Sequence, residues 1–381
     1  MRYAIVGCGT GGPAAALLLK RQGHAVTLFE RVPAPGPVGA GVLIQPTGMR
    51  VLRQLGLLER ALAAGSRIER LYGENHRGRV VLDLGYADLA PGLFGLGLAR
   101  GALFSALWDA AHADGVEVRT GVEIEGFDER PDGVIVAGEA YDRLIIASGA
   151  RSGLRPPGAA VRPYPWGALW AVVPSDLSPR CLTQRYRDTR QMFGMLPSGP
   201  GALSMFWSLR VDARDAWRAA GLEAWKRQIR ALYPEAPLDT LRDPDQIVFA
   251  PYFDVVAPRW HTDRVLWIGD AAHAMSPQLG QGANLALMDA AVLATCETFA
   301  EWSARRRAHL RFYQLASRLL TPFFQSSLPV LAPLRDLVAG PLHAWGWYRR
   351  QMLESLAGTK TGVFSRLQLE DLGAAPDQGT G

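Results

Sequence analysis

Lysine is scarce in this sequence of 381 residues, which contains only Lys20, Lys226 and Lys360. Arginine therefore supplies nearly all of the positive charge behind the net charge of +5. The arginines are scattered, and residues 305–307 form the only run of three. Such a run is more typical of a solvated helix face than of a nucleic-acid-binding surface. The charge pattern therefore argues against nucleic-acid binding.

Cysteine is equally scarce. Cys8, Cys181 and Cys296 include no CxxC pair, which favours a reduced intracellular protein over a disulfide-linked secreted one. No HExxH motif or cysteine spacing predicts a catalytic metal. Met1 leads directly into a strand pattern rather than a signal peptide, and no apolar run reaches the roughly 18 residues of a membrane span. We therefore expect a cytoplasmic protein without an integral membrane segment.

The overall composition is typical of a folded protein. Hydrophobic residues make up 48% of the sequence and charged residues 20%, which excludes a disordered chain, a collagen and a coiled coil. A chain of this length suggests two domains, or one large α/β domain with an insertion.

A glycine motif near the N-terminus predicts a dinucleotide site. Gly7, Gly9 and Gly12 follow a short apolar strand and precede a helix, and Glu30 ends the next strand. The glycines permit a tight turn and let a pyrophosphate approach the helix N-terminus. Glu30 is placed to accept hydrogen bonds from ribose hydroxyls. The motif predicts an adenine dinucleotide and leaves the choice between NAD and FAD open.

A second motif far downstream favours FAD. A buried-strand pattern ends at Gly269 and Asp270, where the carboxylate could reach a hydroxyl of a sugar alcohol. Residues 277–284 could then present backbone N–H groups at a helix start, whose positive dipole end favours a reduced flavin. A strand, loop and helix with incidental glycines would give the same pattern. His273 in this segment is better explained by a structural role than by acid–base catalysis.

Together these motifs resemble those of the class A FAD-dependent monooxygenases, the family of p-hydroxybenzoate hydroxylase. The resemblance covers almost the whole chain, and its tail is similar to the ubiquinone-biosynthesis-type hydroxylases. The matching segments are the glycine turn with Glu30, residues 39–46, the helix start at Arg100 with Leu103, residues 269–273, and the tail segments 319–326 and 356–362.

The resemblance implies an α/β fold: a doubly wound, Rossmann-like FAD-binding domain with an inserted sheet-based substrate domain and C-terminal helices. The insertion coincides with a segment rich in aromatic residues and methionine that alternates like antiparallel strands. The expected divisions are 1–158 for the first part of the FAD-binding domain, 159–258 for the substrate domain, 259–300 for the second part of the FAD-binding domain, and 301–381 for the C-terminal helices and tail.

The resemblance also implies roles for individual residues. Glu30 would bind the adenosine ribose, Arg100 the pyrophosphate region and Asp270 the ribityl chain. Ile124 would contact the adenine side, and residues 280–284 would line the isoalloxazine. The implied cofactor-binding residues are Gly7, Gly9, Gly12, Glu30, Arg31, Gly41, Arg100, Ile124, Asp270, Pro277, Gly280, Gly282, Ala283 and Asn284.

One position departs from the family pattern. The family usually carries an Asp-Gly pair after the buried strand, thought to serve both FAD and NAD(P)H, whereas this chain has Ser148 and Gly149. A serine offers one hydrogen bond but no charge. We therefore expect FAD binding to persist, while direct reduction by NAD(P)H is less certain than the resemblance alone implies.

The sequence assigns no catalytic residue. Gln45 could contact substrate, or it could cap the turn before Pro46. The aromatic residues and methionines of the insertion could line a substrate cavity, although core packing explains each one singly as well. The candidates for substrate contact are Gln45, Gln184, Tyr186, Phe193, Met195 and Phe206.

The predicted function is hydroxylation of an aromatic or similarly electron-rich small molecule, with dioxygen and electrons from NAD(P)H. In the family the oxygen comes from a flavin C4a-hydroperoxide, so no protein nucleophile is needed. Because of Ser148, a flavin oxidase, a redox-neutral flavoenzyme or a monooxygenase with a separate reductase stays open. A halogenase is disfavoured because the Trp-x-Trp-x-Ile-Pro motif is absent, and a non-catalytic FAD-binding partner protein is the remaining alternative. Peripheral contact of the apolar tail with a membrane stays open, and the oligomeric state is not predicted.

Overall fold

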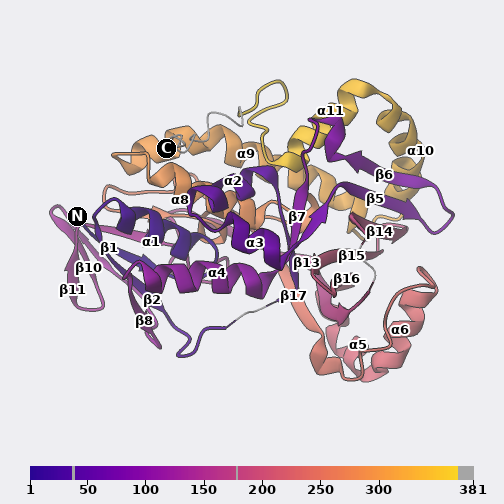
Figure 1. Ribbon diagram of the computed structural model, residues 1–381, viewed down its shortest axis with the longest axis horizontal. Coiled ribbons are helices and arrows are strands. Elements are labelled where there is room, and N and C mark those ends of the chain that lie inside the picture. The colour runs from indigo at the N-terminus through magenta and orange to yellow at the C-terminus, as the bar shows by residue number, and fades with distance from the viewer. Residues whose placement is uncertain (37–38, 177–178, 368–381) are drawn as a thin grey trace, which may run out of the picture.

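The computed structural model describes residues 1–36, 39–176 and 179–367, and a parallel sheet forms the half that carries the N-terminus (Figure 1). The strand order of this sheet is β18-β12-β1-β2-β8. Its strands are β1 (Arg2–Val6), β2 (Ala25–Glu30), β8 (Glu117–Thr120), β12 (Arg143–Ile146) and β18 (Val265–Trp267). The central strands are apolar without alternation, as expected for a parallel sheet covered on both faces.

Helices and a small meander cover this sheet. α1 packs against both α4 and α8, and α9 packs against α8. The antiparallel meander contacts β1 and β12. The elements are α1 (Gly11–Arg21), α4 (Arg100–Ala113), α7 (Asp270–His273), α8 (Gly282–Leu293), α9 (Phe299–Phe324), β9 (Asp128–Arg130), β10 (Gly133–Val136) and β11 (Glu139–Tyr141). The chain thus returns to its first sheet through β18 and α8, as a two-part cofactor domain requires.

A seven-stranded sheet forms the second half, with the order β17-β13-β16-β15-β14-β5-β6. Its strands are β5 (Arg70–Asn75), β6 (Val80–Gly85), β13 (Ala160–Pro174), β14 (Cys181–Arg187), β15 (Gln191–Gly199), β16 (Ala202–Arg210) and β17 (Val248–Val256). Residues 70–85 were placed by the sequence in the first part of the FAD-binding domain. They instead extend this sheet, because β5 pairs with β14 in parallel.

Each face of the seven-stranded sheet has its own core. One face packs against α6 (Leu222–Arg230), which follows the short α5 (Arg214–Ala220). The helical pattern is broken between them at Gly221, whose φ of +80° lies in the left-handed region. The other face packs toward β3 and α11. Because both faces are buried, the strands carry apolar residues on both sides.

A third sheet, of order β3-β7-β4, joins the two halves. It comprises β3 (Gly41–Ile44), β4 (Ser66–Ile68) and β7 (Gly95–Ala99), and the adjoining helices are α2 (Pro46–Gln54) and α3 (Leu58–Ala64). β7 runs so close to β15 that a Cβ at Gly97 would overlap the carbonyl oxygen of Pro197. Glycine at this position therefore lets the cofactor half and the substrate half touch backbone to backbone.

The C-terminal helices cover the outer end of the seven-stranded sheet. α10 (Leu331–Ala344) and α11 (Gly346–Ala357) both contact β6, at the side of the molecule opposite the N-terminus (Figure 1). The last part of the predicted tail, residues 368–381, lies outside the described residues. Within the described part of the chain, no helix combines the length and the apolar character needed to cross a bilayer.

Candidate active site

Two neighbouring cavities meet at the N-terminus of α8. The first, which we name the dinucleotide cavity, has a volume of about 400 Å³ and lies between α1, α4 and α8. The second, which we name the central cavity, has a volume of about 350 Å³ and lies between α8 and the seven-stranded sheet. Val42, Arg100, Asp270, Gly282 and Ala283 line both cavities. One ligand could therefore extend from the first cavity into the second.

The glycine turn forms one wall of the dinucleotide cavity. A Cβ at Gly12 would overlap the carbonyl oxygen of Gly7, so glycine at this position allows α1 to begin against β1. A Cβ at Gly9 would meet no protein atom within 4 Å. Gly12 thus serves the packing of the chain, while Gly9 leaves open the space through which a pyrophosphate would approach.

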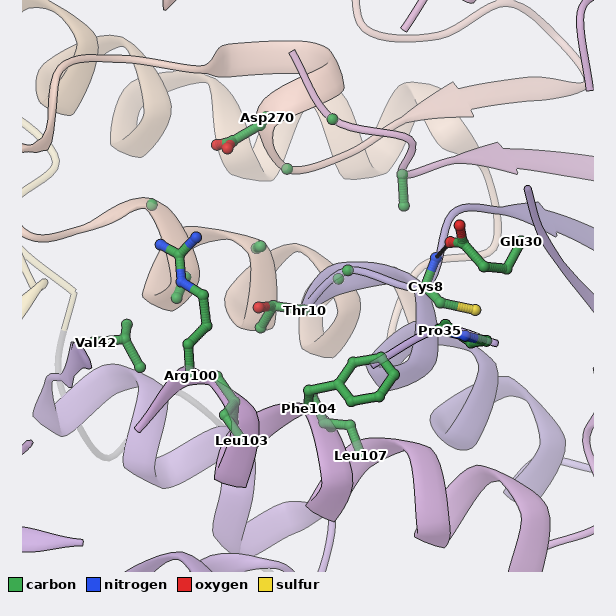
Figure 2. A pocket seen from close by; sticks show the side chains of 18 of the residues that line it. Cys8, Thr10, Glu30, Pro35, Val42, Arg100, Leu103, Phe104, Leu107 and Asp270 are labelled. Atoms are coloured by element: carbon green, nitrogen blue, oxygen red, sulfur yellow. Dashed lines mark hydrogen bonds between the residues drawn. The ribbon is translucent and has the colours of Figure 1, made fainter. Parts of the chain in front are cut away.

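Glu30 is fixed at the end of this wall. Its carboxylate accepts a hydrogen bond from the backbone N–H of Cys8 at 2.9 Å and another from Val32 at 3.0 Å. Figure 2 shows the carboxylate beside the glycine turn, at the end of the cavity away from Asp270. Each carboxylate oxygen keeps a lone pair, so Glu30 can still accept from two adjacent hydroxyls of a ribose.

Arg100 and Asp270 extend into the dinucleotide cavity from opposite sides (Figure 2). Arg100 begins α4, where its backbone N–H donates to the carbonyl oxygen of Ala40 at 2.8 Å. Asp270 begins α7 after Gly269, whose φ of +59° turns the chain sharply. Within residues 1–36, 39–176 and 179–367, neither side chain forms an ion pair. The guanidinium is thus open to an anion and the carboxylate to a hydroxyl.

Two helix N-termini point at the cavities. α1 begins at Gly11 and α8 at Gly282, and neither has a side chain that caps its first N–H groups. Uncapped N–H groups together with the helix dipole attract negative charge. The α1 terminus faces the dinucleotide cavity alone, whereas the α8 terminus faces both cavities. This arrangement suits a molecule with a diphosphate near α1 and an electron-rich ring near α8.

The residues present therefore fit FAD. Glu30 would hold the adenosine ribose, the α1 terminus and Arg100 the diphosphate, and Asp270 the ribityl hydroxyls. The α8 terminus would face the flavin ring at the boundary of the two cavities. When bound, FAD would supply electron transfer and the activation of dioxygen.

Comparisons with known proteins agree with this fit. The family described as FAD binding domain matches residues 1–301. Aurachin C monooxygenase/isomerase from Stigmatella aurantiaca is 31% identical over 313 residues, covering 77% of this chain and 79% of the relative. The 6-hydroxynicotinate 3-monooxygenase of Bordetella bronchiseptica is 28% identical, covering 77% of this chain and 81% of the relative.

This chain belongs to the class A FAD-dependent monooxygenases. This monooxygenase has the same fold as Klebsiella pneumoniae HpxO complexed with FAD and uric acid. That structure has a TM-score of 0.81 at 22% identity, covering 95% of this chain and 98% of the other. The predictions of the fold class, of the family and of FAD as cofactor are thereby confirmed.

The predicted cofactor residues of the monooxygenase fall into four groups. Those that line the dinucleotide cavity are Gly9, Glu30, Arg100, Asp270, Gly282 and Ala283, and those that line only the central cavity are Gly41, Pro277 and Gly280. Gly7 and Gly12 shape the turn behind the wall. The remaining three, Arg31, Ile124 and Asn284, lie outside both linings.

The residues of this fourth group have surroundings of other kinds. Arg31 is exposed and pairs with Glu123 at 3.7 Å. Ile124 is half-buried and packs against the core of the cofactor half, and its contact with the adenine side stays a prediction. Asn284 is fully buried, accepts from the backbone N–H of Gln45 at 2.8 Å and donates to the Leu43 carbonyl at 3.1 Å. Asn284 therefore holds β3 against α8 instead of lining the flavin ring.

The central cavity contains two of the predicted substrate residues, Gln184 and Phe206. Gln45 is instead fully buried, and its side chain accepts a hydrogen bond from the Tyr86 hydroxyl at 2.6 Å. Phe193 and Met195 lie in the core shared with α6, on the other face of the sheet. Successive strand residues point to opposite faces, and here both faces are apolar, so composition alone could not select the correct one.

Several residues of the central cavity escaped the sequence prediction as substrate contacts. Trp170 and Tyr252 line it from β13 and β17, and Leu71 and Leu82 line it from β5 and β6. The clustering of aromatic residues in the insertion was the available signal for Trp170. No sequence signal could place Leu71 and Leu82 there, because the pairing of β5 with β14 is long-range.

A buried charged network supports the loop that carries Asp270. Asp289, on α8, accepts hydrogen bonds from the Gly269 backbone N–H at 2.8 Å, His273 Nε2 at 2.6 Å and Arg306 Nε at 2.8 Å. Burial opposes the charged carboxylate, but His273 and Arg306 together lower the pKa of Asp289. The network ties the loop of Asp270 to α8 and α9, and it gives His273 a structural role.

Ser148 follows β12 beside the glycine turn. Its Oγ is buried and finds no hydrogen-bond partner among the described residues. The backbone of Ser148 lies so near Gly7 that a Cβ at Gly7 would come within 2.8 Å of the Ser148 Cα. Within the described part of the chain, this hydroxyl therefore forms no hydrogen bond that would explain a serine here.

Proposed function

We propose that this FAD-dependent monooxygenase hydroxylates a planar, electron-rich aromatic substrate held in the central cavity. The observation that carries the proposal is the lining of that cavity, where Trp170, Phe206, Tyr252 and Phe253 supply ring surfaces beside the α8 terminus. Flat aromatic side chains favour offset or edge-on contact with a flat ligand. Hydroxynicotinate and uric acid, which appear in the descriptions of two similar proteins, are also flat heterocycles.

The group that activates the aromatic ring for oxygenation would have to be part of the substrate. Of the described residues that line the central cavity, those that titrate are Arg100, Asp270 and Tyr252. We assign Arg100 and Asp270 to the cofactor, and burial raises the pKa of Tyr252 well above its ordinary value. Tyr252 would therefore stay protonated and could donate a hydrogen bond to a hydroxyl or oxo group on the ring. A ring that carries a hydroxyl or amino group is the substrate class that fits.

The chain itself would position the substrate and exclude water. Trp170 and Phe206 pack in a tilted arrangement with ring centroids 5.0 Å apart and form one apolar wall. Gln184 adds an amide to the lining, and its Oε1 accepts a hydrogen bond from the Tyr186 hydroxyl at 2.6 Å. We assign no catalytic acid or base to the protein.

NAD(P)H is the proposed electron donor, and dioxygen the second substrate. Ser148 would then have to serve in place of the aspartate that the family usually carries. A cytoplasmic location agrees with this proposal, because nicotinamide cofactors are supplied there.

The proposal is tested by anaerobic reduction of the purified holoenzyme followed by aerobic turnover. NADH or NADPH should bleach the bound flavin, and a hydroxylated aromatic should accelerate bleaching. After air is admitted, the product should gain one oxygen atom. Bleaching without an oxygenated product would indicate an oxidase. A flavin that only dithionite reduces would indicate a separate reductase or a redox-neutral reaction.

A further inference from the structure

A third cavity adjoins the central cavity on the side of the C-terminal helices. It has a volume of about 330 Å³, and we name it the apolar cavity. It lies between β6, β14 and the helices α9, α10 and α11. Its hydrocarbon lining includes Val81, Leu320, Phe323, Phe324, Val338 and Met352. Nothing in the proposed chemistry at the flavin uses this space.

The apolar cavity and the central cavity meet at side chains that line both, namely Leu82, Gln184, Gln278 and Leu279. The two glutamines are held by protein partners. Tyr186 donates to the Oε1 of Gln184 at 2.6 Å, and Gln278 donates to the Oε1 of Gln325 at 2.8 Å. The boundary between the two cavities therefore consists of side chains. A ligand in one cavity could extend between these side chains into the other cavity.

Most polar groups of the apolar cavity are already engaged within the protein, and the buried Nη2 of Arg335 lies in an ion pair but has no hydrogen-bond partner among the described residues. Arg335 pairs with Asp336 at 2.7 Å and donates to the carbonyl oxygens of Asp188 and Phe323. The Tyr186 hydroxyl is occupied by Gln184. A polar ligand would find few partners here, whereas a hydrocarbon would bury apolar surface at no cost in broken hydrogen bonds.

The far end of the apolar cavity reaches the surface at α10. Leu334 and Val338 both line the cavity and are 49% and 37% exposed. Leu337, which is not part of the lining, is 64% exposed on the same helix. The space is therefore open at an apolar rim at one end and adjoins the central cavity at the other.

We propose that the substrate is amphiphilic, with its aromatic head in the central cavity and a hydrocarbon chain in the apolar cavity. The inference rests on the proposed function for the position of the head. The shared boundary side chains, the hydrocarbon lining and the engaged polar groups specify a linear or branched alkyl chain attached to the ring. A separate lipid or a second protein would not need the boundary with the central cavity.

Binding of a 4-alkylphenol series to the oxidised holoenzyme tests this inference without turnover. The series runs from phenol through increasingly long linear chains, and flavin fluorescence reports binding. Each methylene buried contributes about 0.8 kcal/mol, so Kd should fall about fourfold per carbon until the apolar cavity is full. A Kd that does not depend on chain length overturns the inference.

Val338→Trp is designed to fill the apolar cavity, and Leu337→Trp is its matched control on the adjacent, outward-facing position. Val338→Trp should abolish the dependence on chain length while leaving the Kd of phenol unchanged. Leu337→Trp should behave like the parent enzyme. Equal chain-length increments in all three proteins would overturn the inference, because the chain would then bind elsewhere. Met352→Trp, on α11, gives the same test from another wall if Val338→Trp does not fold.

Linear 1-alkanols separate failure of this inference from failure of the proposed function. They should compete with long-chain alkylphenols and should lose this ability in Val338→Trp. Chain-dependent binding of alkanols without oxygenation of any phenol would support the apolar cavity and contradict the proposed head group. Oxygenation of phenol together with absence of any chain effect would support the proposed function and contradict the inference.

Discussion

At the scale of single residues, the cofactor site depends on a few charges set at a distance from one another. Glu30, Arg100 and Asp270 come from three separate segments and line one cavity. Asp270 lies in a loop that is fixed by a buried hydrogen bond, which the Gly269 N–H donates to Asp289. The carboxylate itself remains free for a ligand hydroxyl.

Asp270→Ala should therefore yield a folded protein with little or no FAD. The substitution removes a charge-assisted hydrogen bond to the ribityl chain, and hydrogen bonds to charged groups are worth about 1.5–3 kcal/mol. The ratio of flavin absorbance to protein after purification measures the effect. Asp215→Ala is the control, because Asp215 also lies in the first turn of a short helix but is remote from the cavities. Full flavin occupancy in Asp270→Ala would refute the assignment.

Ser148 is the residue at which this chain departs from the family pattern. Ser148→Asp should raise the rate at which NAD(P)H reduces the flavin by about tenfold, if one hydrogen bond to a charged group of about 1.5 kcal/mol is what the serine lacks. Stopped-flow reduction under nitrogen measures the rate. Ser148→Asn introduces a side chain of nearly the same size as aspartate but without its charge, so the rate of flavin reduction should not rise in this variant. An unchanged or lower rate in Ser148→Asp would mean that the serine is adapted to another route of reduction.

At the scale of elements, the unit β1–turn–α1 separates two uses of glycine. Gly12→Ala should destabilise the apoprotein by about 1–3 kcal/mol or more, because the methyl group overlaps the Gly7 carbonyl. Gly9→Ala should leave the stability of the apoprotein nearly unchanged but reduce its FAD content, because the new methyl group would occupy the open cavity. Thermal denaturation of the apoproteins and flavin content after reconstitution measure both effects. Equal loss of stability in the two variants would contradict this division of roles.

The same element was predictable from the sequence because its signals are local. Gly7, Gly12 and Glu30 act within one strand–turn–helix–strand unit, and the structure forms that unit as expected. The seven-stranded sheet was less predictable. Phe193 and Met195 carry the same apolar signal as Met192 and Leu196, which lie in the core on the other face, and only the pairing of the sheet decides which face meets the cavity.

Long-range pairing also explains the other differences. β5 and β6 show ordinary strand patterns, yet nothing local says that β5 pairs with β14, about a hundred residues away. Gln45 was a reasonable candidate for substrate contact, but its partner Tyr86 comes from a distant segment. The residues that line the dinucleotide cavity were predictable where a motif fixes the backbone. Of the predicted substrate residues, only Gln184 and Phe206 line the central cavity, because that cavity is assembled from many segments.

At the scale of the whole molecule, α9 links the cofactor loop to the C-terminal segment. His309 Nε2 donates to the Gly358 carbonyl at 2.8 Å, and its Nδ1 accepts from Arg306. This pattern needs a neutral imidazole. Burial and the Arg306 charge lower the pKa of His309 to about 3.

This histidine predicts a pH dependence of stability. Below the ordinary histidine pKa of 6.5, the unfolded chain binds a proton that the folded protein does not. The contribution of neutral His309 to the free energy of unfolding is therefore complete above pH 6.5. It is lost as pH falls toward 3, by at most about 1.4 kcal/mol per pH unit. The midpoint of urea denaturation should fall less steeply with acidification in His309→Gln than in the parent protein. Parallel slopes would show that another group controls acid stability.

The strands β13 and β17 determine how the two halves can move. They form an antiparallel ladder from Ala160↔Val256 to Trp170↔Val248, with a register shift between Pro163 and Gly167. The Val255 N–H donates to the Ala274 carbonyl at 3.0 Å, which ties β17 to the segment after α7. Both strands belong to the seven-stranded sheet, and they lead to and from the cofactor half side by side at Ala160 and Val256. We therefore expect a movement between the halves to bend this pair of strands as a unit, so amide exchange in β13 and β17 should stay slow throughout the catalytic cycle.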